Sequence, residues 1–185
     1  MKTPQVLTDF VAACRLAAKE PDARSAIVEL MRSLVMDTDS LSAAMPAMDT
    51  HDSSPVGTLG GDVTLFEDDS VTIVLVDTLP HVLQPPHDHL MTAIIGMFEG
   101  CEQQRFWSRT ADGIAPAAGR DLLAGEVLVI GTDGIHAIGT CDDIARGIHV
   151  YLGSLSNVAR SIFHPETLEE QPLSMALYND YCRAA

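Results

Sequence analysis

The chain has 185 residues, of which 46% are hydrophobic and 20% are charged, a balance typical of a globular domain with a real hydrophobic core. Its formal net charge of -15 repels phosphate backbones and anionic lipid, so neither nucleic acid nor a membrane surface is an expected partner. There is no apolar run of the roughly 18–20 residues that a membrane span needs and no signal-peptide core, so we expect a cytoplasmic protein.

The first part of the chain has helical periodicity. Leu7, Phe10 and Cys14 recur at the spacing of one helix face, and Ile27 and Met31 belong to a second apolar stripe. These patterns predict a helical hairpin over residues 4–36 that packs on the rest of the protein as a scaffold. Residues 37–61 are rich in Asp, Ser, Pro, Gly and Met, and they read as a connecting segment. We therefore divide the chain into a helical segment with its linker, 1–61, and a second unit, 62–185.

From residue 62 onward, short apolar and β-branched runs alternate with turn residues, a pattern typical of an all-β sandwich or barrel. The predicted strands are Val63–Glu67, Val71–Asp77, Met91–Phe98, Gln103–Arg109, Val127–Ile130, Ile135–Gly139 and Arg146–Leu152. Residues 153–185 are predicted to form loops and short helix.

The cysteines are far apart in the sequence and form no CxxC pair. They are Cys14, Cys101, Cys141 and Cys182. In a reducing compartment we expect free thiols rather than disulfides, with Cys101 and Cys141 buried or at the rim of the barrel.

The segment Pro85-Pro86-His87-Asp88-His89 carries the most chemical information. In an extended strand, His87 and His89 point to the same side and Asp88 to the other, so the two imidazoles can bind one metal ion. A third histidine, His136, lies on a later predicted strand, which we place on the opposite wall of the barrel. Together the three histidines predict a metal site.

These residues resemble the cysteine dioxygenase-like thiol dioxygenases of the cupin superfamily, and most of all the 3-mercaptopropionate dioxygenase branch and its uncharacterised relatives. The likeness extends over roughly residues 60–172. Its strongest stretches are PPHDHLMTAIIGMFEGCEQQRFW, LLAGEVLVIGTDGIHAIG, GIHVYLGSL and SIFHPETLEEQP. The resemblance implies a mainly β fold, a cupin double-stranded β-helix (a jelly-roll barrel) with an N-terminal helical hairpin.

The resemblance also implies a single Fe(II) ion bound by His87, His89 and His136. Many cupins add a glutamate four or five residues after the second histidine, but Ala93 and Ile94 occupy those positions here. An all-histidine set fits an iron dioxygenase better than manganese cupins of the oxalate type, although such sites also accept Zn, Ni or Mn.

A second motif is Gly147-Ile148-His149-Val150-Tyr151. Strand alternation places His149 and Tyr151 on one face and aliphatic residues on the other, which suggests that the polar pair faces the metal cavity. The resemblance implies a serine–histidine–tyrosine relay here, with His149 and Tyr151 as catalytic residues. This chain has Gly147 where the family has serine, so the relay is shortened. A hydrogen-bonded core pair is the alternative interpretation.

Two arginines are candidates for substrate binding. Arg160 follows Val158-Ala159, in a context similar to that of the family's carboxylate-binding arginine, and a guanidinium binds a carboxylate through two parallel hydrogen bonds. An ordinary surface arginine is the alternative. Arg105, which alternates with Trp107, is the weaker candidate.

The resulting hypothesis is an iron-dependent thiol dioxygenase that converts a small thiol carboxylate, similar to 3-mercaptopropionate or cysteine, to its sulfinic acid. Its partners are the thiol and O2, and assembly as a homodimer is left open. One alternative is a metal-dependent cupin of another reaction class, a lyase, isomerase or hydrolase. Another is a non-enzymatic cupin that binds a metal or a small ligand; Gly147 in the serine position keeps that option open.

Overall fold

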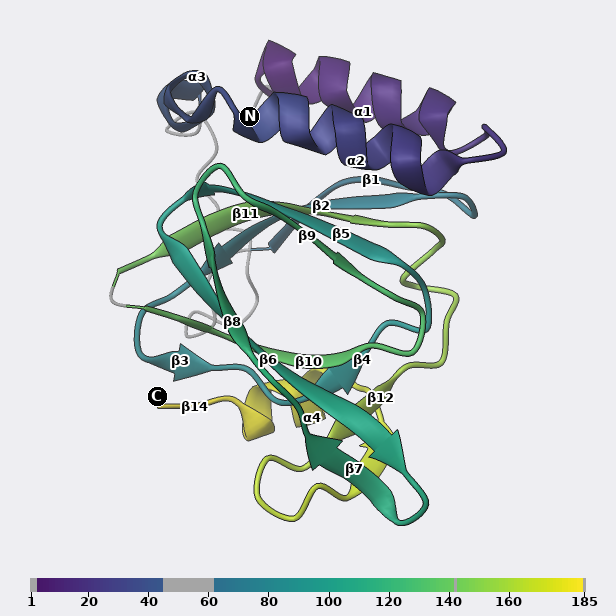
Figure 1. The fold of residues 1–185 in the computed structure, drawn as a ribbon, viewed down its shortest axis with the longest axis vertical. Helices are drawn as coiled ribbons and strands as arrows, with labels where there is room; N and C mark the ends of the chain where they lie inside the picture. The colour runs from purple at the N-terminus through teal and green to yellow at the C-terminus, as the bar shows by residue number, and fades with distance from the viewer. Residues whose placement is uncertain (1–2, 45–61, 142, 185) are drawn as a thin grey trace.

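Helices form the first part of the chain and a curled pair of sheets forms the rest (Figure 1). The computed structural model describes residues 3–44, 62–141 and 143–184. The helices are α1 (Gln5–Ala17), α2 (Ala23–Val35), α3 (Thr38–Ala44) and α4 (Met175–Tyr181). The predicted hairpin is confirmed as α1 and α2, while residues 45–61 of the predicted linker lie outside the described residues. No helix in the described ranges is long and apolar enough to cross a membrane.

The strands form two large sheets and one short pair. The five-stranded sheet has the order β1 (Asp62–Glu67), β2 (Thr72–Thr78), β11 (Ala145–Tyr151), β5 (Ala93–Glu99), β9 (Val127–Ile130). The seven-stranded sheet has the order β13 (Glu170–Pro172), β12 (Ser161–Phe163), β4 (His87–Asp88), β10 (Ile135–Thr140), β6 (Cys101–Thr110), β7 (Gly113–Pro116), with β8 (Arg120–Leu123) also paired to β6. The short pair is β3 (Val82–Leu83) with β14 (Arg183–Ala184).

The two large sheets curl toward each other into the predicted cupin-type double-stranded β-helix (Figure 1). All seven predicted strands are present, with bounds shifted by no more than two residues. The strands that the sequence pattern missed are short, and several lie in the tail after residue 153, which was predicted to be loop and helix.

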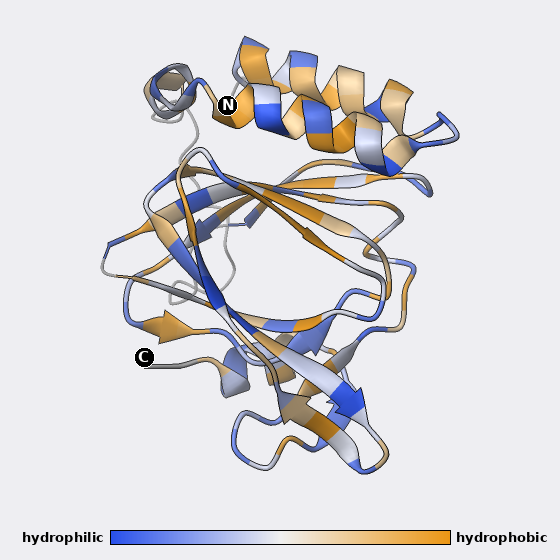
Figure 2. Ribbon diagram, viewed as in Figure 1, coloured by the Kyte–Doolittle hydropathy of each residue, from blue (hydrophilic) through white to orange (hydrophobic). Residues whose placement is uncertain are grey.

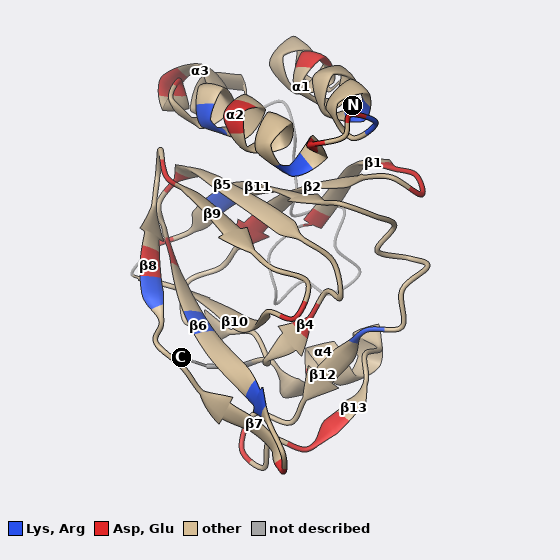
Figure 3. Ribbon diagram, turned by 45° about the vertical axis from the view of Figure 1, so that its right-hand side comes forward, with Lys and Arg blue, Asp and Glu red and all other residues tan. Residues whose placement is uncertain are grey.

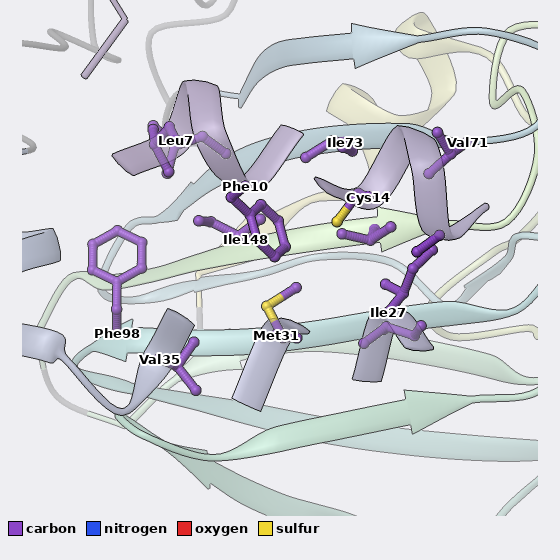
Figure 4. Packing of buried hydrophobic residues seen from close by; sticks show 14 of the residues in the cluster. Leu7, Phe10, Cys14, Ile27, Met31, Val35, Val71, Ile73, Phe98 and Ile148 are labelled. Atoms are coloured by element: carbon purple, nitrogen blue, oxygen red, sulfur yellow. The ribbon is translucent and has the colours of Figure 1, made fainter. Parts of the chain in front are cut away.

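Helices α1 and α2 cover the outer face of the five-stranded sheet (Figure 1). Alternation along β11 directs Ile148 and Val150 into the cluster beneath these helices, whereas Gly147, His149 and Tyr151 face the barrel interior. Figure 2 shows hydrophobic residues along both the helices and the strands below them. Figure 4 shows side chains of the two helices packing against the sheet.

A glycine allows α2 to lie close to β5. A Cβ atom on Gly96 would lie 2.3 Å from Sδ of Met31 and 2.9 Å from Cγ1 of Val35, closer than real contacts allow. Met31 and Val35 are fully buried as a result. The helical hairpin is therefore part of the hydrophobic core, because it packs directly on the barrel.

The prediction of free cysteines is wrong for one pair. Cys101 and Cys141 form a disulfide bond, with their Cα atoms 5.5 Å apart. They are separated by 40 residues in sequence, but the antiparallel pairing of β6 with β10 places them side by side. Cys14 and Cys182 are free thiols, and Cys14 is buried under the helices.

Charged residues are distributed over the helices, the loops and the sheet ends, and acidic ones predominate (Figure 3). The overall field is therefore anionic, and a binding site for an anion needs a local cation.

Candidate metal centre

Strand pairing brings His87 and His136 together. Strand β4 lies between β10 and β12, and His87 is directly opposite His136 in the β4–β10 ladder. Residues opposite each other in a ladder have side chains on the same face, so both rings enter the barrel interior. His136 therefore comes from the neighbouring strand, and its predicted place on the opposite wall is wrong.

The ring nitrogens of His87, His89 and His136 converge on one point. Their ligand atoms all lie within 4.8 Å of one another, and Nε2 of His89 is 2.9 Å from Nε2 of His136. Nitrogens bound about 2.1 Å from one ion at right angles are about 3 Å apart, so the spacing fits a shared metal ion. In the described part of the chain, no carboxylate belongs to this cluster.

Hydrogen bonds orient two of the rings. Nδ1–H of His87 donates to the carbonyl of Pro85 at 3.0 Å, which leaves Nε2 free to bind a metal ion. Nδ1–H of His136 donates to Oε1 of Gln104 at 2.8 Å. The Gln104 amide is itself fixed, because its Nε2 donates to Oε2 of Glu102 at 2.6 Å, so Oε1 is the atom that faces His136.

Burial keeps the three imidazoles neutral. It lowers the pKa of His87 to about 4 and the pKa values of His89 and His136 well below their usual range. Neutral imidazoles at physiological pH present the lone pairs that a divalent ion needs. The donor set fits Fe(II) and, by the same chemistry, Zn, Ni or Mn.

Asp88, between the two histidines of the motif, points away from the cluster and fixes the strand. Its carboxylate is buried; Oδ1 accepts from the backbone N–H of Ser161 and Oδ2 from the guanidinium of Arg109. Arg109 also binds Glu170 on β13. The outward face of β4 is thus tied to β6, β12 and β13, which holds both histidines in place.

A cavity of about 180 Å³ opens beside the histidines. His87 and His89 line it, and the tail of the chain closes one side with Leu173, Met175 and Tyr178. The ring of Tyr178 on α4 lies 5.8 Å from the ring of His87. Gln84, just before the motif, also lines the cavity.

His149 and Tyr151 face this cavity, as strand alternation predicts. Nδ1 of His149 lies 3.2 Å from Oη of Tyr151, and the Tyr151 ring is 4.7 Å from the ring of His89. Burial raises the pKa of Tyr151, so the phenol keeps its proton.

The structure places only one of the two candidate arginines at the cavity. Arg160 lines the cavity, and its charge lowers the pKa values of His87, His89 and Tyr151. Its guanidinium forms no hydrogen bond or ion pair with any residue that the structure describes. Arg105 is exposed on the outer face of β6 and does not line the cavity, so it is not brought to the site.

Sequence reasoning missed three residues at the site, namely Glu102, Gln104 and Tyr178. Glu102 and Gln104 are polar residues two positions apart on one face of β6, and both are 1% exposed. The alternation of Glu102 and Gln104 could have been seen in the sequence, but the predicted strand begins at residue 103 and the candidate residue Arg105 lies on its opposite face. No signal pointed to Tyr178, whose helix reaches the site through the tertiary fold.

Comparisons with known proteins identify the fold but not a family. No family model matches the chain, and no curated protein matches its sequence. The crystal structure of DMSP lyase DddQ from Ruegeria pomeroyi DSS-3 matches with a TM-score of 0.55 and 16% identity, over 89% of this chain and 99% of that one.

Two partial matches cover about half of the chain. An RmlC-like cupin with a double-stranded β-helix fold from Methanocaldococcus jannaschii has a TM-score of 0.44 and 11% identity, over 51% of this chain and 81% of that one. Oxalate decarboxylase OxdC from Bacillus subtilis has a TM-score of 0.42 and 15% identity, over 51% and 25%. At these identities the likeness concerns the fold alone.

Proposed function

We propose that this protein is an iron-dependent thiol dioxygenase that oxidises a small thiol carboxylate. The observation that carries the proposal is a cavity with two binding features. One is the cluster of three neutral imidazoles without a carboxylate, of which His87 and His89 line the cavity. The other is the guanidinium of Arg160, which forms no hydrogen bond or ion pair with the described residues. A ligand that places a sulfur at the first and a carboxylate at the second matches both.

His87, His89 and His136 would hold the ion. Ferrous iron held by neutral ligands keeps its full charge and open positions, and it would supply dioxygen activation and a site for the thiolate. The overall reaction is R–SH + O2 → R–SO2H, in which sulfur is oxidised, dioxygen is reduced and both oxygen atoms end on sulfur.

The chain's own residues would bind and orient the substrate. The Arg160 guanidinium would form two parallel hydrogen bonds with the carboxylate, against the anionic field of the protein. The Tyr151 phenol, kept protonated by burial, would present its oxygen near the reacting sulfur as a hydrogen-bond acceptor for the thiol. Leu173, Met175 and Tyr178 would exclude bulk water from that side.

Oxygen uptake tests the reaction. Protein reconstituted with Fe(II) should consume oxygen with 3-mercaptopropionate or cysteine and yield a product heavier by two oxygen atoms, while metal-free protein should not. If the iron-loaded protein consumes no oxygen with either of these thiols or with cysteamine, the dioxygenase proposal fails. A lyase, isomerase, hydrolase or binding function in the same cavity would then have to replace it.

Arg160→Met tests the substrate class. Hydrogen bonds to a charged partner contribute about 1.5–3 kcal/mol, so KM for 3-mercaptopropionate should rise roughly 10- to 100-fold. KM for cysteamine, which has no carboxylate, should change little. Arg105→Met removes an equivalent charge from the outer face and is the matched control. Equal changes in KM for both thiols would exclude carboxylate binding by Arg160.

A further inference from the structure

One buried carboxyl group lies behind both halves of the site. Glu102 on β6 is 1% exposed. Its Oε1 accepts a hydrogen bond from Oγ1 of Thr78 at 3.1 Å, and its Oε2 accepts one from Nε2 of Gln104 at 2.6 Å. The same Oε2 lies 3.9 Å from Nε2 of His149. Glu102 does not line the cavity, so any effect it has on the site must pass through its neighbours.

The first path runs from Glu102 to the cluster of three histidines. Glu102 fixes the Gln104 amide, and the amide oxygen accepts the Nδ1 proton of His136 at 2.8 Å. Because an amide presents its oxygen on one side and its NH2 on the other, the carboxyl determines which atom faces the histidine. The tautomer and ring orientation of His136 therefore depend on Glu102.

The second path runs to the His149–Tyr151 pair. Nε2 of His149 is buried without a hydrogen-bond partner among the described residues, and Oε2 of Glu102 lies 3.9 Å from it. Gly147, which lies two residues before His149 on the same face of β11, has no side chain that could form a hydrogen bond with Nε2. A Cβ there would lie 2.8 Å from Sδ of Met97 and 3.6 Å from Nε2 of His149, so the space is already filled.

We propose that Glu102 is a positioning residue that serves both paths: through Gln104 it orients the His136 imidazole toward a metal ion, and through His149 it orients and polarises the phenol of Tyr151. The second path rests on the proposed function, while the first requires only that the site binds a divalent ion.

The second path acts through hydrogen bonds and transfers no proton. A carboxylate 3.9 Å from Nε2 favours the tautomer with hydrogen on Nε2, and then the Tyr151 hydroxyl donates to Nδ1 of His149. That hydrogen bond fixes the direction of the phenol and polarises its O–H bond, and the lone pairs of the phenol oxygen stay free to accept a hydrogen bond in the cavity.

Cobalt affinity tests the first path without any turnover. In Gln104→Leu, His136 loses its hydrogen-bond acceptor, so the dissociation constant for Co(II), followed by its visible absorption, should rise about 10- to 100-fold. Gln103→Leu changes the adjacent residue, which faces the other way on β6, and is the matched control. Glu102→Leu removes the acceptor that fixes the Gln104 amide, so its cobalt affinity should fall as well. Cobalt affinities that are equal in Gln104→Leu and in the control would overturn the first path.

Glu102→Gln tests the second path. An amide has the shape of the carboxyl but lacks the charge that favours hydrogen on Nε2, so kcat with 3-mercaptopropionate should fall about 10- to 100-fold while KM stays the same. An unchanged kcat in Glu102→Gln would overturn the second path. If the unaltered protein binds Co(II) but oxidises no thiol, the proposed function fails, and the cobalt result for Gln104→Leu still decides the first path.

Discussion

The two large sheets enclose the same interior but bury different kinds of residue. The five-stranded sheet is apolar on its outer face, which α1 and α2 cover, and its inner face carries His149 and Tyr151 among mostly apolar side chains; β2 is buried along its whole length. The seven-stranded sheet supplies His87, His136, Glu102 and Gln104 to the interior, while its outer face is largely open to solvent. The comparison teaches that one sheet stabilises the barrel through packing, whereas the other holds a costly polar cluster through hydrogen bonds.

The largest expected effect is the loss of metal from the seven-stranded sheet. His136→Ala should reduce bound metal from about one ion per chain to almost none, because two imidazoles alone bind a divalent ion weakly. Elemental analysis after reconstitution measures this, and circular dichroism should show an intact fold. His81→Asn is the control, since His81 is exposed with a positive φ that asparagine tolerates. Stoichiometric metal in His136→Ala would refute the assigned ligand.

The next largest expected effect is a loss of stability where α2 packs on the five-stranded sheet. Met31→Ala removes a fully buried side chain that fills the space above Gly96, so the free energy of unfolding should fall by about 2–5 kcal/mol. Denaturant titration measures the loss. Met36, which is 82% exposed, gives the control variant Met36→Ala, with an expected change within about 0.5 kcal/mol. Cobalt affinity should be unaffected in both variants, and a large loss of affinity in Met31→Ala would contradict the division between the sheets.

The smallest effect is a pH dependence at Glu102. Burial raises its pKa from 4.5 to about 7 in the folded protein, so the folded state keeps a proton that the unfolded chain has already lost. This stabilising contribution is complete below about pH 4.5 and is lost as the pH rises through about 7, a total of about 3 kcal/mol.

Glu102→Gln is neutral at every pH and should not show this decline. Chemical denaturation of metal-free protein from pH 4.5 to 8 should therefore favour the variant increasingly as the pH rises. The buried histidines titrate in both proteins, so the difference between them isolates Glu102. Parallel stability curves would show that the carboxyl is not perturbed by burial.

The sequence predicted those features that depend on local periodicity. Alternation along the strand placed His149 and Tyr151 on the cavity side, and the HxH spacing placed His87 and His89 together. Features that depend on which strands pair could not be predicted from local periodicity. The position of His136 beside His87 and the disulfide between Cys101 and Cys141 both follow from which strand pairs with β10.

Other features depend on contacts between distant parts of the chain. Tyr178 reaches the cavity only because the tail folds back across the barrel mouth. Glu102 gains its importance from its position near His149, because Gly147 stands where the resembling family has serine. The sequence alone indicated a shortened relay, whereas the structure shows that a carboxyl from the neighbouring sheet faces the same histidine.

The disulfide between Cys101 and Cys141 restricts the ways in which strand β6 can pair incorrectly with strand β10. It joins β6 and β10 next to the position at which Glu102 is paired with Thr140. If β6 were threaded one residue out of step, every side chain on it would exchange faces, and Arg105 would replace Gln104 beside His136. That misassembled barrel would bury a cation beside the proposed metal site. In the observed register the two cysteines lie side by side and Glu102 is directed inward, so the disulfide holds β6 in the register that the site requires.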